Sequence, residues 1–193
     1  MQAIILPNFL TESQCNQLIE LAKPTVTRST GFNVGDGTES YSENRTSEHT
    51  FLPKNANQLV TLVEEMVSRQ TNLPVESQEG IQIAHYVPGQ HFGLHHDYFD
   101  PRFKGAEVTL SRGGQRVLTF MIYLNSIPEG YGGETYFNHA GMSVKPDIGK
   151  ACLWYNVFPN MGIDVSTMHE GRTPKEPYEK WIATIWVREG IFV

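Results

Sequence analysis

Three histidines and two aspartates fall within ten positions of this chain, in the segment HFGLHHDYFD (91–100), although the whole sequence has only seven histidines. His95 and Asp97 are two positions apart, and in an extended chain such residues point to the same side, so both could bind one metal ion. His96 would then face away. A helical zinc pair of His91 with His95 is disfavoured, because a Pro-Gly pair precedes it and a glycine interrupts it.

His169 is a candidate for a third ligand. It follows a strand-like run, GIDVST (162–167), and is far enough along the chain to come from a different strand. Two histidines and one carboxylate are the facial ligand set of non-haem Fe(II) oxygenases, which leaves positions open for a cosubstrate and dioxygen. A zinc site would more usually use cysteine or a third histidine. Any one of these histidines alone indicates only a surface or core residue, so the prediction depends on the set.

A lysine stands at the start of KWIATIWVR (180–188), a segment whose two faces are both rich in apolar residues. Such a pattern predicts a buried strand. An unpaired ammonium group is costly to bury, so Lys180 would need an anion, which a dicarboxylate cosubstrate could supply. In the alternative interpretation, Lys180 simply extends its amine to solvent at the end of the strand.

Two helices are expected before residue 79. Thr11 and Gln14 form a capping box for the first helix, which Pro24 ends; the second begins near Asn55, stops before Thr71 and should pack beside the first. The apolar residues at helical spacing are Cys15, Leu18, Ile19 and Ala22 in the first helix and Leu59, Val63, Met66 and Val67 in the second.

From residue 80 the sequence changes to short β-rich runs, which indicate a sandwich or barrel. These runs are IQIAHY, QRVLTFMIYL, GMSVKP, GKACLWYN, GIDVST and KWIATIWVR. Two stretches read as loops. Residues 25–48 have few apolar side chains and should contribute little to a core, so they indicate a lid or a disordered connection. Together with 98–114 they could close over a substrate.

Composition excludes several functional classes. The 193 residues predict one domain (1–193), and 15 Lys and Arg against 21 Asp and Glu give a net charge of −6, which opposes nucleic-acid binding. No apolar run is long enough for a membrane span and no basic export signal precedes the first apolar run. Cys15 and Cys152, each among apolar neighbours, suggest buried thiols in a reducing compartment, so we expect a cytoplasmic protein without membrane contact.

Three blocks in order make the chain resemble a prolyl 4-hydroxylase of the Fe(II)/2-oxoglutarate-dependent dioxygenase superfamily. They are YVPGQHFGLHHD (86–97), GGQRVLTFMIYLN with GGETYF, and His169 followed by KWIATIW. The resemblance implies a mainly β fold with flanking helices (α+β), a double-stranded β-helix or jelly roll. Residues 80–193 would form its core, and residues 1–79 would supply the buttressing helices and a lid loop.

The resemblance also implies roles for individual residues. Fe(II) would be bound by His95, Asp97 and His169, with dioxygen and 2-oxoglutarate as cosubstrates and ascorbate as reductant. The far carboxylate of 2-oxoglutarate would pair with Lys180, and the cosubstrate would also be bound by Tyr86, Thr135 and Thr184. The substrate peptide would be contacted by Arg116, Trp186 and Phe92, of which Phe92 stands where the family often has tyrosine.

The implied activity is hydroxylation of proline in a peptide or protein, with release of succinate and CO2. The same chemistry on a free amino acid, a small molecule or a non-prolyl residue is an alternative. Another is a non-catalytic jelly-roll binding module, which would have no need of Lys180 behind the metal. A nucleic-acid demethylase ranks last, because the chain is acidic and such relatives carry arginine at the position of Lys180.

Overall fold

The computed structural model describes residues 3–32 and 39–193. Its helices and strands are, in chain order, β1 (Ala3–Leu6), α1 (Glu12–Ala22), β2 (Thr27–Arg28), β3 (Gly31–Phe32), β4 (Glu39–Ser40), β5 (Glu48–Leu52), α2 (Gln58–Thr71), the 3-10 helix η1 (Val75–Ser77), β6 (Ile81–Tyr86), β7 (Phe92–His95), α3 (Ala106–Leu110), β8 (Arg116–Tyr123), β9 (Thr135–Phe137), β10 (Met142–Val144), β11 (Ala151–Tyr155), the 3-10 helix η2 (Val165–Thr167), β12 (His169–Gly171) and β13 (Lys180–Arg188).

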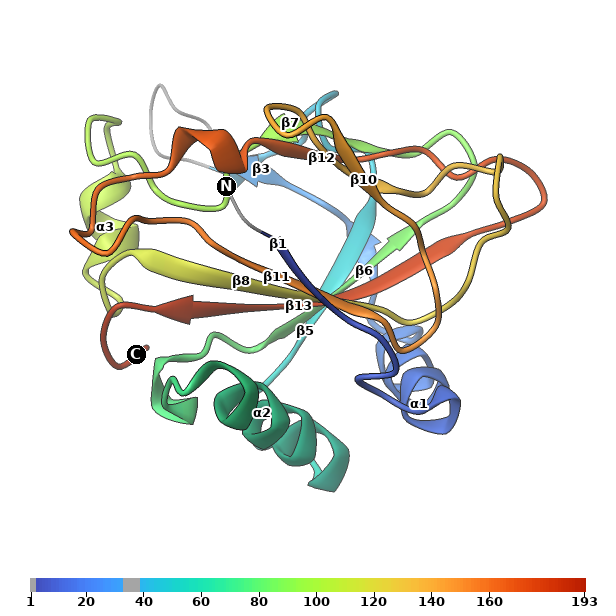
Figure 1. Ribbon diagram of the computed structural model, residues 1–193, viewed down its shortest axis with the longest axis horizontal. Coiled ribbons are helices and arrows are strands. Elements are labelled where there is room, and N and C mark those ends of the chain that lie inside the picture. The colour runs from blue at the N-terminus through green and yellow to red at the C-terminus, as the bar shows by residue number, and fades with distance from the viewer. Residues whose placement is uncertain (1–2, 33–38) are drawn as a thin grey trace.

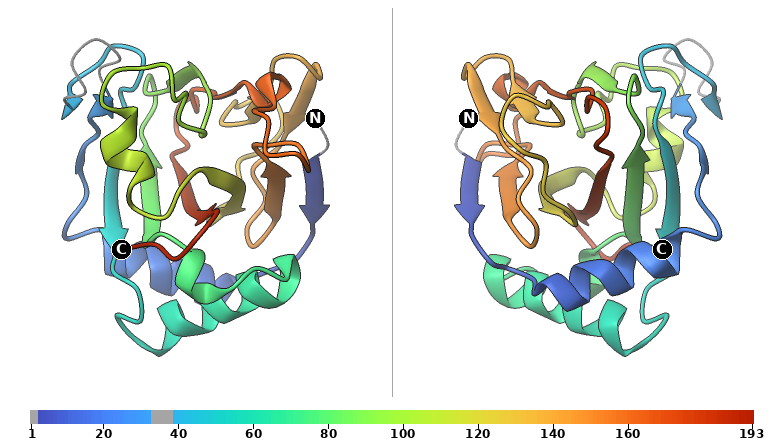
Figure 2. Two further views of the ribbon diagram at one scale, coloured as in Figure 1. Left: turned by 90° about the vertical axis from the view of Figure 1, so that its left-hand side faces the viewer. Right: turned by 90° about the vertical axis from the view of Figure 1, so that its right-hand side faces the viewer.

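Two antiparallel sheets and a pair of helices form three layers (Figure 1). Within the described ranges, the large sheet has the strand order β1-β11-β8-β13-β6-β5-β2, and the small sheet has the order β10-β9-β12-β7. Helices α1 and α2 cover the face of the large sheet that is turned away from the small one, as the side views of Figure 2 also show. The architecture confirms the expected jelly roll with buttressing helices.

The central strands of the large sheet separate two cores. Every residue of β13 is buried, and the side chains alternate between the two faces. Trp181 and Ile185 belong to an apolar core shared with α1 and α2, whereas Ile182 belongs to a second core together with Tyr86 and Trp154 between the sheets. This confirms the predicted assignment of KWIATIWVR to a strand buried on both faces.

The two helices form largely where the sequence predicts them. Thr11 and Gln14 make the expected capping box, and all four predicted apolar residues of α1 are buried. Helix α2 begins a little later than expected, because Asn57 caps it by accepting hydrogen bonds from Leu59 N and Val60 N. Its buried face is slightly rotated from the predicted one: Val60, Val63, Glu64 and Val67 are buried, while Leu59 and Met66 pack only partly against the core.

Three local predictions are wrong. GIDVST (162–167) forms no strand: it ends in η2, where the Asp164 carboxylate accepts hydrogen bonds from the backbone and hydroxyl of Ser166 and stabilises a turn. The presumed loop 98–114 contains α3. The stretch 25–48 contains β2, β3, β4 and the start of β5, and it buries two serines, Ser29 and Ser47, completely; its residues 33–38 lie outside the described part of the chain.

No helix in the described part of the chain is long and apolar enough to cross a bilayer.

Cys15 and Cys152 are both buried free thiols, as the sequence predicts. Burial raises the pKa of Cys15 to about 11 and that of Cys152 to about 12. Both thiols are therefore protonated and unreactive at neutral pH.

A buried ionic cluster joins the ends of three segments of the large sheet. Glu79, which precedes β6, accepts hydrogen bonds from Arg116 of β8 at 2.7 and 2.8 Å and from Arg188 of β13 at 2.6 Å. Burial alone would raise the pKa of Glu79, but the two guanidinium groups outweigh it and hold this pKa below its usual range. The cluster therefore stays ionised and ties the three segments together.

We predict that Glu79→Gln lowers the free energy of unfolding by about 3–5 kcal/mol, because it leaves the buried Arg188 and the partly buried Arg116 without their counter-ion. Urea unfolding followed by fluorescence measures the change. The matched control is Glu20→Gln, which breaks an exposed pair with Lys23 and should cost about 1 kcal/mol or less. Equal, small losses in both variants would contradict a stabilising role of the cluster.

Candidate functional site

The structure brings His95, Asp97 and His169 together in one cluster. Their potential ligand atoms all lie within 4.8 Å of one another. Among the described residues, this is the group of His, Cys, Asp or Glu side chains that could hold a metal ion. Nε2 of His95 lies 3.6 Å from Asp97 Oδ1, and Nε2 of His169 lies 3.8 Å from Asp97 Oδ2. Strand pairing explains the convergence, because His169 of β12 is the register partner of His95 on β7.

Backbone carbonyl groups orient both imidazoles. Nδ1 of His95 lies 2.8 Å from the carbonyl oxygen of Gly93, and Nδ1 of His169 lies 2.9 Å from that of Thr167. Each Nδ1 must therefore carry the proton that it donates, which leaves Nε2 as a lone-pair donor facing the centre of the cluster. His96 is outside this cluster and stacks on Tyr98, as expected from its alternation with His95.

The Asp97 carboxylate is held by a second layer of side chains. Thr119 donates a hydrogen bond to Asp97 Oδ2 at 2.7 Å, and Asn156 donates one to the Thr119 hydroxyl at 2.9 Å. Burial would raise the pKa of Asp97, but the imidazoles and the Thr119 hydroxyl outweigh it and hold this pKa well below its usual range. Burial lowers the pKa of His169 to about 4. A carboxylate beside neutral imidazoles is the state that binds a divalent cation.

Lys180 lies in the same region, at the start of β13. Its side chain is completely buried, and no described residue hydrogen-bonds to its amine. Burial lowers the pKa of Lys180 to about 7, while the charge of Glu134 opposes this shift only in part. A Cβ atom on Gly171 would lie 3.3 Å from both Lys180 Nζ and the Tyr86 hydroxyl, so these groups converge next to Gly171, two residues along β12 from His169.

The other predicted cosubstrate-binding residues line the same inner face. Tyr86 is the register partner of Lys180 and is 2% exposed, and its ring centroid lies 4.5 Å from the lysine amine. Thr135 is the register partner of Gly171, but its hydroxyl already accepts a hydrogen bond from Tyr123 at 2.9 Å. Thr184 is buried on the same face of β13 as Ile182, two residues farther along the strand, and its register partners are Gln82 and Met121. Their roles toward a cosubstrate stay predictions.

These residues fit a divalent metal with a dicarboxylate ligand. The donor set of two imidazoles and one carboxylate suits Fe(II). The unpartnered Lys180 amine suits a carboxylate, and Gly171 leaves free the space that a side chain would fill. Without an anion, the charged form of this amine would be strongly disfavoured.

The predicted substrate-binding residues lie next to the metal cluster. Trp186 is the register partner of Thr119, whose hydroxyl contacts Asp97. The guanidinium of Arg116 lies 3.7 Å from the centroid of the Trp186 ring. Phe92 stacks on the His95 ring, with centroids 3.5 Å apart, so its observed contact is with a predicted metal ligand. A contact of these three residues with a peptide stays a prediction.

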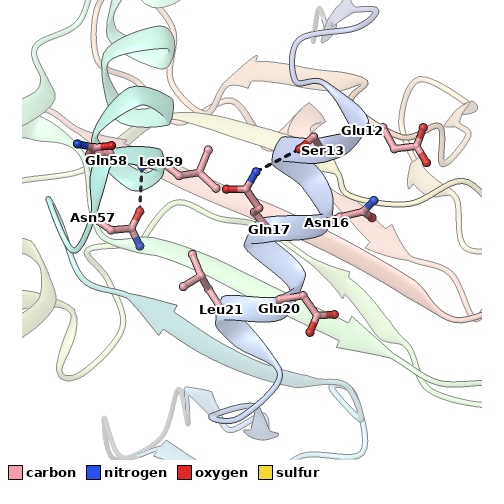
Figure 3. Close-up of a pocket in the computed structure, with 9 residues that line it drawn as sticks. All are labelled: Glu12, Ser13, Asn16, Gln17, Glu20, Leu21, Asn57, Gln58 and Leu59. Atoms are coloured by element: carbon pink, nitrogen blue, oxygen red, sulfur yellow. Dashed lines mark hydrogen bonds between the residues drawn. The ribbon is translucent and has the colours of Figure 1, made fainter.

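A hollow between the two helices has no such features. A groove of about 1080 Å³ lies between α1 and α2 (Figure 3), and it is lined by Glu12, Ser13, Asn16, Gln17, Glu20, Leu21, Asn57, Gln58 and Leu59. It is on the far side of the large sheet from β7 and β12, which carry the two histidines of the cluster. The size of a hollow therefore does not identify the candidate site, whereas the grouping of metal ligands does.

Sequence reasoning missed the supporting residues Thr119, Tyr123 and Asn156. Thr119 and Tyr123 share one face of β8, because they are four residues apart on a strand. The signal was a pair of hydroxyl side chains four positions apart within the otherwise apolar stretch VLTFMIYL. Asn156 follows β11 and offered no comparable signal, since its partner Thr119 is 37 residues away.

Comparison with known proteins agrees with this site. The family model of the 2OG-Fe(II) oxygenase superfamily matches residues 81–188. Probable prolyl 4-hydroxylase 10 of Arabidopsis thaliana is 35% identical over an alignment of 206 positions, which covers 97% of this chain and 68% of that protein. Prolyl 4-hydroxylase 5 of the same plant is 35% identical over 204 residues, covering 96% of this chain and 67% of the relative.

Solved structures show the same fold. The 2OG complex of the viral collagen prolyl hydroxylase from Paramecium Bursaria Chlorella virus-1 has a TM-score of 0.76 and 25% identity, covering 97% of this chain and 96% of that one. A Trichoplax adhaerens prolyl hydroxylase, in complex with a hypoxia inducible factor peptide fragment, has a TM-score of 0.66 at 18% identity over 97% of this chain and 83% of its own. The chain described here belongs to the prolyl 4-hydroxylase family of the 2OG-Fe(II) oxygenase superfamily.

Proposed function

We propose that this chain hydroxylates proline residues of a peptide or protein, with Fe(II), dioxygen and 2-oxoglutarate. The observation that carries the proposal is the buried Lys180 amine, which has no hydrogen-bond partner among the described residues. This amine lies next to Gly171, which is two residues along β12 from the candidate metal ligand His169. A protein that only bound a metal would gain nothing from this costly arrangement.

The metal ligands and Lys180 would have separate roles. His95, Asp97 and His169 would hold Fe(II), and Lys180 would pair with the far carboxylate of 2-oxoglutarate. The chemistry supplied by bound Fe(II) is the coupling of 2-oxoglutarate decarboxylation, to succinate and CO2, with insertion of one oxygen atom into a C–H bond. The protein residues orient the cosubstrate and keep water away from it.

A proline-containing segment is the proposed substrate. Trp186 and Arg116, the predicted peptide contacts, form a stacked pair beside Thr119, in which the Trp186 side chain is largely buried. An extended proline-rich chain also loses little conformational entropy on binding. The relatives described above are named for prolyl hydroxylation, which supports the same substrate class.

The direct test is mass spectrometry of proline-rich peptides incubated with the protein, Fe(II), ascorbate and 2-oxoglutarate. We expect one added oxygen atom on proline and an equal amount of succinate. Oxidation of free proline or another small molecule in place of the peptides would favour the alternative substrates. Absence of 2-oxoglutarate-dependent oxygen uptake with every substrate would contradict an enzymatic role.

We predict that Asp97→Ala abolishes metal binding and succinate formation, because it removes the carboxylate of the cluster. The matched control is Asp100→Ala, three residues away, since the Asp100 carboxylate forms an ion pair with Arg102 instead. Calorimetric titration with Mn(II) measures metal binding without turnover. Loss of metal binding in Asp100→Ala, together with its retention in Asp97→Ala, would show that Asp100 and not Asp97 is the carboxylate ligand.

Binding of 2-oxoglutarate should weaken as the pH rises above neutrality. The pKa of Lys180 in the free protein is about 7, and a bound carboxylate would raise this pKa, so the ligand binds together with a proton above pH 7. Each further pH unit should therefore raise the dissociation constant on the order of tenfold. Anaerobic calorimetry of the Mn(II)-loaded protein gives this constant, and a flat profile above neutrality would refute the pairing.

Lys180→Met should weaken 2-oxoglutarate binding by about 100-fold or more, because the far carboxylate would lose its cation. The variant should also lose the pH dependence of binding. Its free energy of unfolding should stay equal or rise, since methionine fills the space without burying an amine. Unchanged affinity in a folded Lys180→Met protein would place the cosubstrate elsewhere.

A further inference from the structure

A row of polar side chains crosses the large sheet from the Lys180 amine toward its β2 edge. Lys180 is the register partner of Tyr86, and the register of β5 with β6, which pairs Glu48 with His85, brings Ser47 opposite Tyr86 when it is continued by one residue. The register of β2 with β5, which pairs Arg28 with Glu48, likewise brings Ser29 opposite Ser47, and Ser29 N donates to the Ser47 carbonyl at 2.8 Å. Directly opposite residues in antiparallel strands share one face, so these four side chains are neighbours.

Hydrogen bonds connect this row. The Ser47 and Ser29 hydroxyls lie 3.2 Å apart, and the Ser29 hydroxyl lies 2.8 Å from Nδ1 of His49. Burial raises the pKa of the Tyr86 phenol, and the neighbouring Ser47 side chain lowers this pKa in part. His49 shares the face of Ser47, since it is two residues along the same chain segment. Ser29 and Ser47 are completely buried, whereas the ring of His49 is partly exposed. The row therefore links a buried pocket to the surface.

Such a chain of hydroxyl groups has a direction. Each hydroxyl carries one proton, so it can donate along the chain in only one sense at a time. A carboxylate is an acceptor only. If Tyr86 donates to a carboxylate beside Lys180, it must accept from Ser47, which accepts from Ser29. The Ser29 hydroxyl then needs a donor of its own, and Nδ1 of His49 is the group in reach. Without the carboxylate, every bond can run in the opposite sense and end on His49 Nδ1 as the acceptor.

We propose that Ser47, Ser29 and His49 are positioning residues for 2-oxoglutarate, and that its far carboxylate aligns this chain so that His49 Nδ1 carries a proton and Tyr86 donates into the pocket. The inference rests on the proposed function, because it requires 2-oxoglutarate beside Lys180. The change conserves protons: each hydroxyl rotates with its own proton, and the partly exposed imidazole exchanges its proton between its two nitrogens through water.

The experiment follows the histidine nitrogens and the affinity together. Protein labelled with 15N-histidine and loaded with Zn(II), which is diamagnetic, is titrated with 2-oxoglutarate. The signal that is missing in His49→Gln identifies the His49 ring. We expect its Nδ1 to change from an unprotonated to a protonated nitrogen as 2-oxoglutarate binds. In Ser47→Ala this response should disappear, and the dissociation constant measured by calorimetry should rise about fivefold, as expected for one lost hydrogen bond.

Two further variants keep the test decisive. Ser29→Ala breaks the chain one step farther from the pocket, and it should also abolish the His49 response. Thr50→Ala is the matched control, because Thr50 is on the same strand but its hydroxyl pairs with that of Thr25; affinity and response should both stay as in the wild type. An unchanged His49 Nδ1 in the wild type would overturn the proposal, as would wild-type affinity in Ser47→Ala. A wild-type protein that does not bind 2-oxoglutarate at all would overturn the proposed function as well.

Discussion

Burial of the Lys180 amine is the constraint around which the site is arranged. The side chain is 0% exposed, and a buried cation that lacks a counter-ion costs several kcal/mol. The free protein reduces this cost by lowering the pKa of the amine, so that the neutral form becomes accessible at physiological pH. A dicarboxylate removes the need for that compromise. In the proposed function, the affinity for 2-oxoglutarate would therefore come from a destabilised group that the surrounding sheet holds in place.

The division of the interior into two cores makes this arrangement possible. One face of the large sheet packs against α1 and α2 mainly through apolar side chains, and the buried Glu64 of α2 is an exception whose carboxylate accepts from Asn55 N. The other face meets the small sheet and carries Tyr86, Tyr123 and Lys180 among its apolar residues. Strand β13 contributes to both faces by simple alternation, so a single strand anchors the fold and presents the lysine.

Register connects the separate parts of the site. Pairing of β7 with β12 brings His95 to His169, and pairing of β8 with β13 places Trp186 beside Thr119, which holds Asp97. The candidate peptide contact thus shares a rung of the large sheet with Thr119, the residue that holds Asp97. A slip of one residue in either pairing would turn the side chains to the opposite face and dismantle both. The ionic cluster of Glu79 with two arginines ties together the ends of the segments that must stay aligned.

The sequence by itself determined the features that depend on local pattern. The β-rich composition of IQIAHY and the two apolar faces of KWIATIWVR predicted the central strands, and the capping box located α1. The spacing of His95 and Asp97 predicted one side of a candidate metal site. Prolyl hydroxylation, which the resemblance implied, agrees with the family comparisons, whereas cytoplasmic location and the absence of nucleic-acid partners stay predictions from the sequence.

Only the tertiary structure decided which distant residues meet. Short polar segments such as 25–48 carry little local signal, yet pairing with β5 and β6 buries Ser29 and Ser47 beside Tyr86. GIDVST has the composition of a strand, but the Asp164 side chain stabilises a turn within it. The physical reason is the same in both cases: the side-chain pattern sets what a segment can bury, whereas its partners across the sheet set what it does bury.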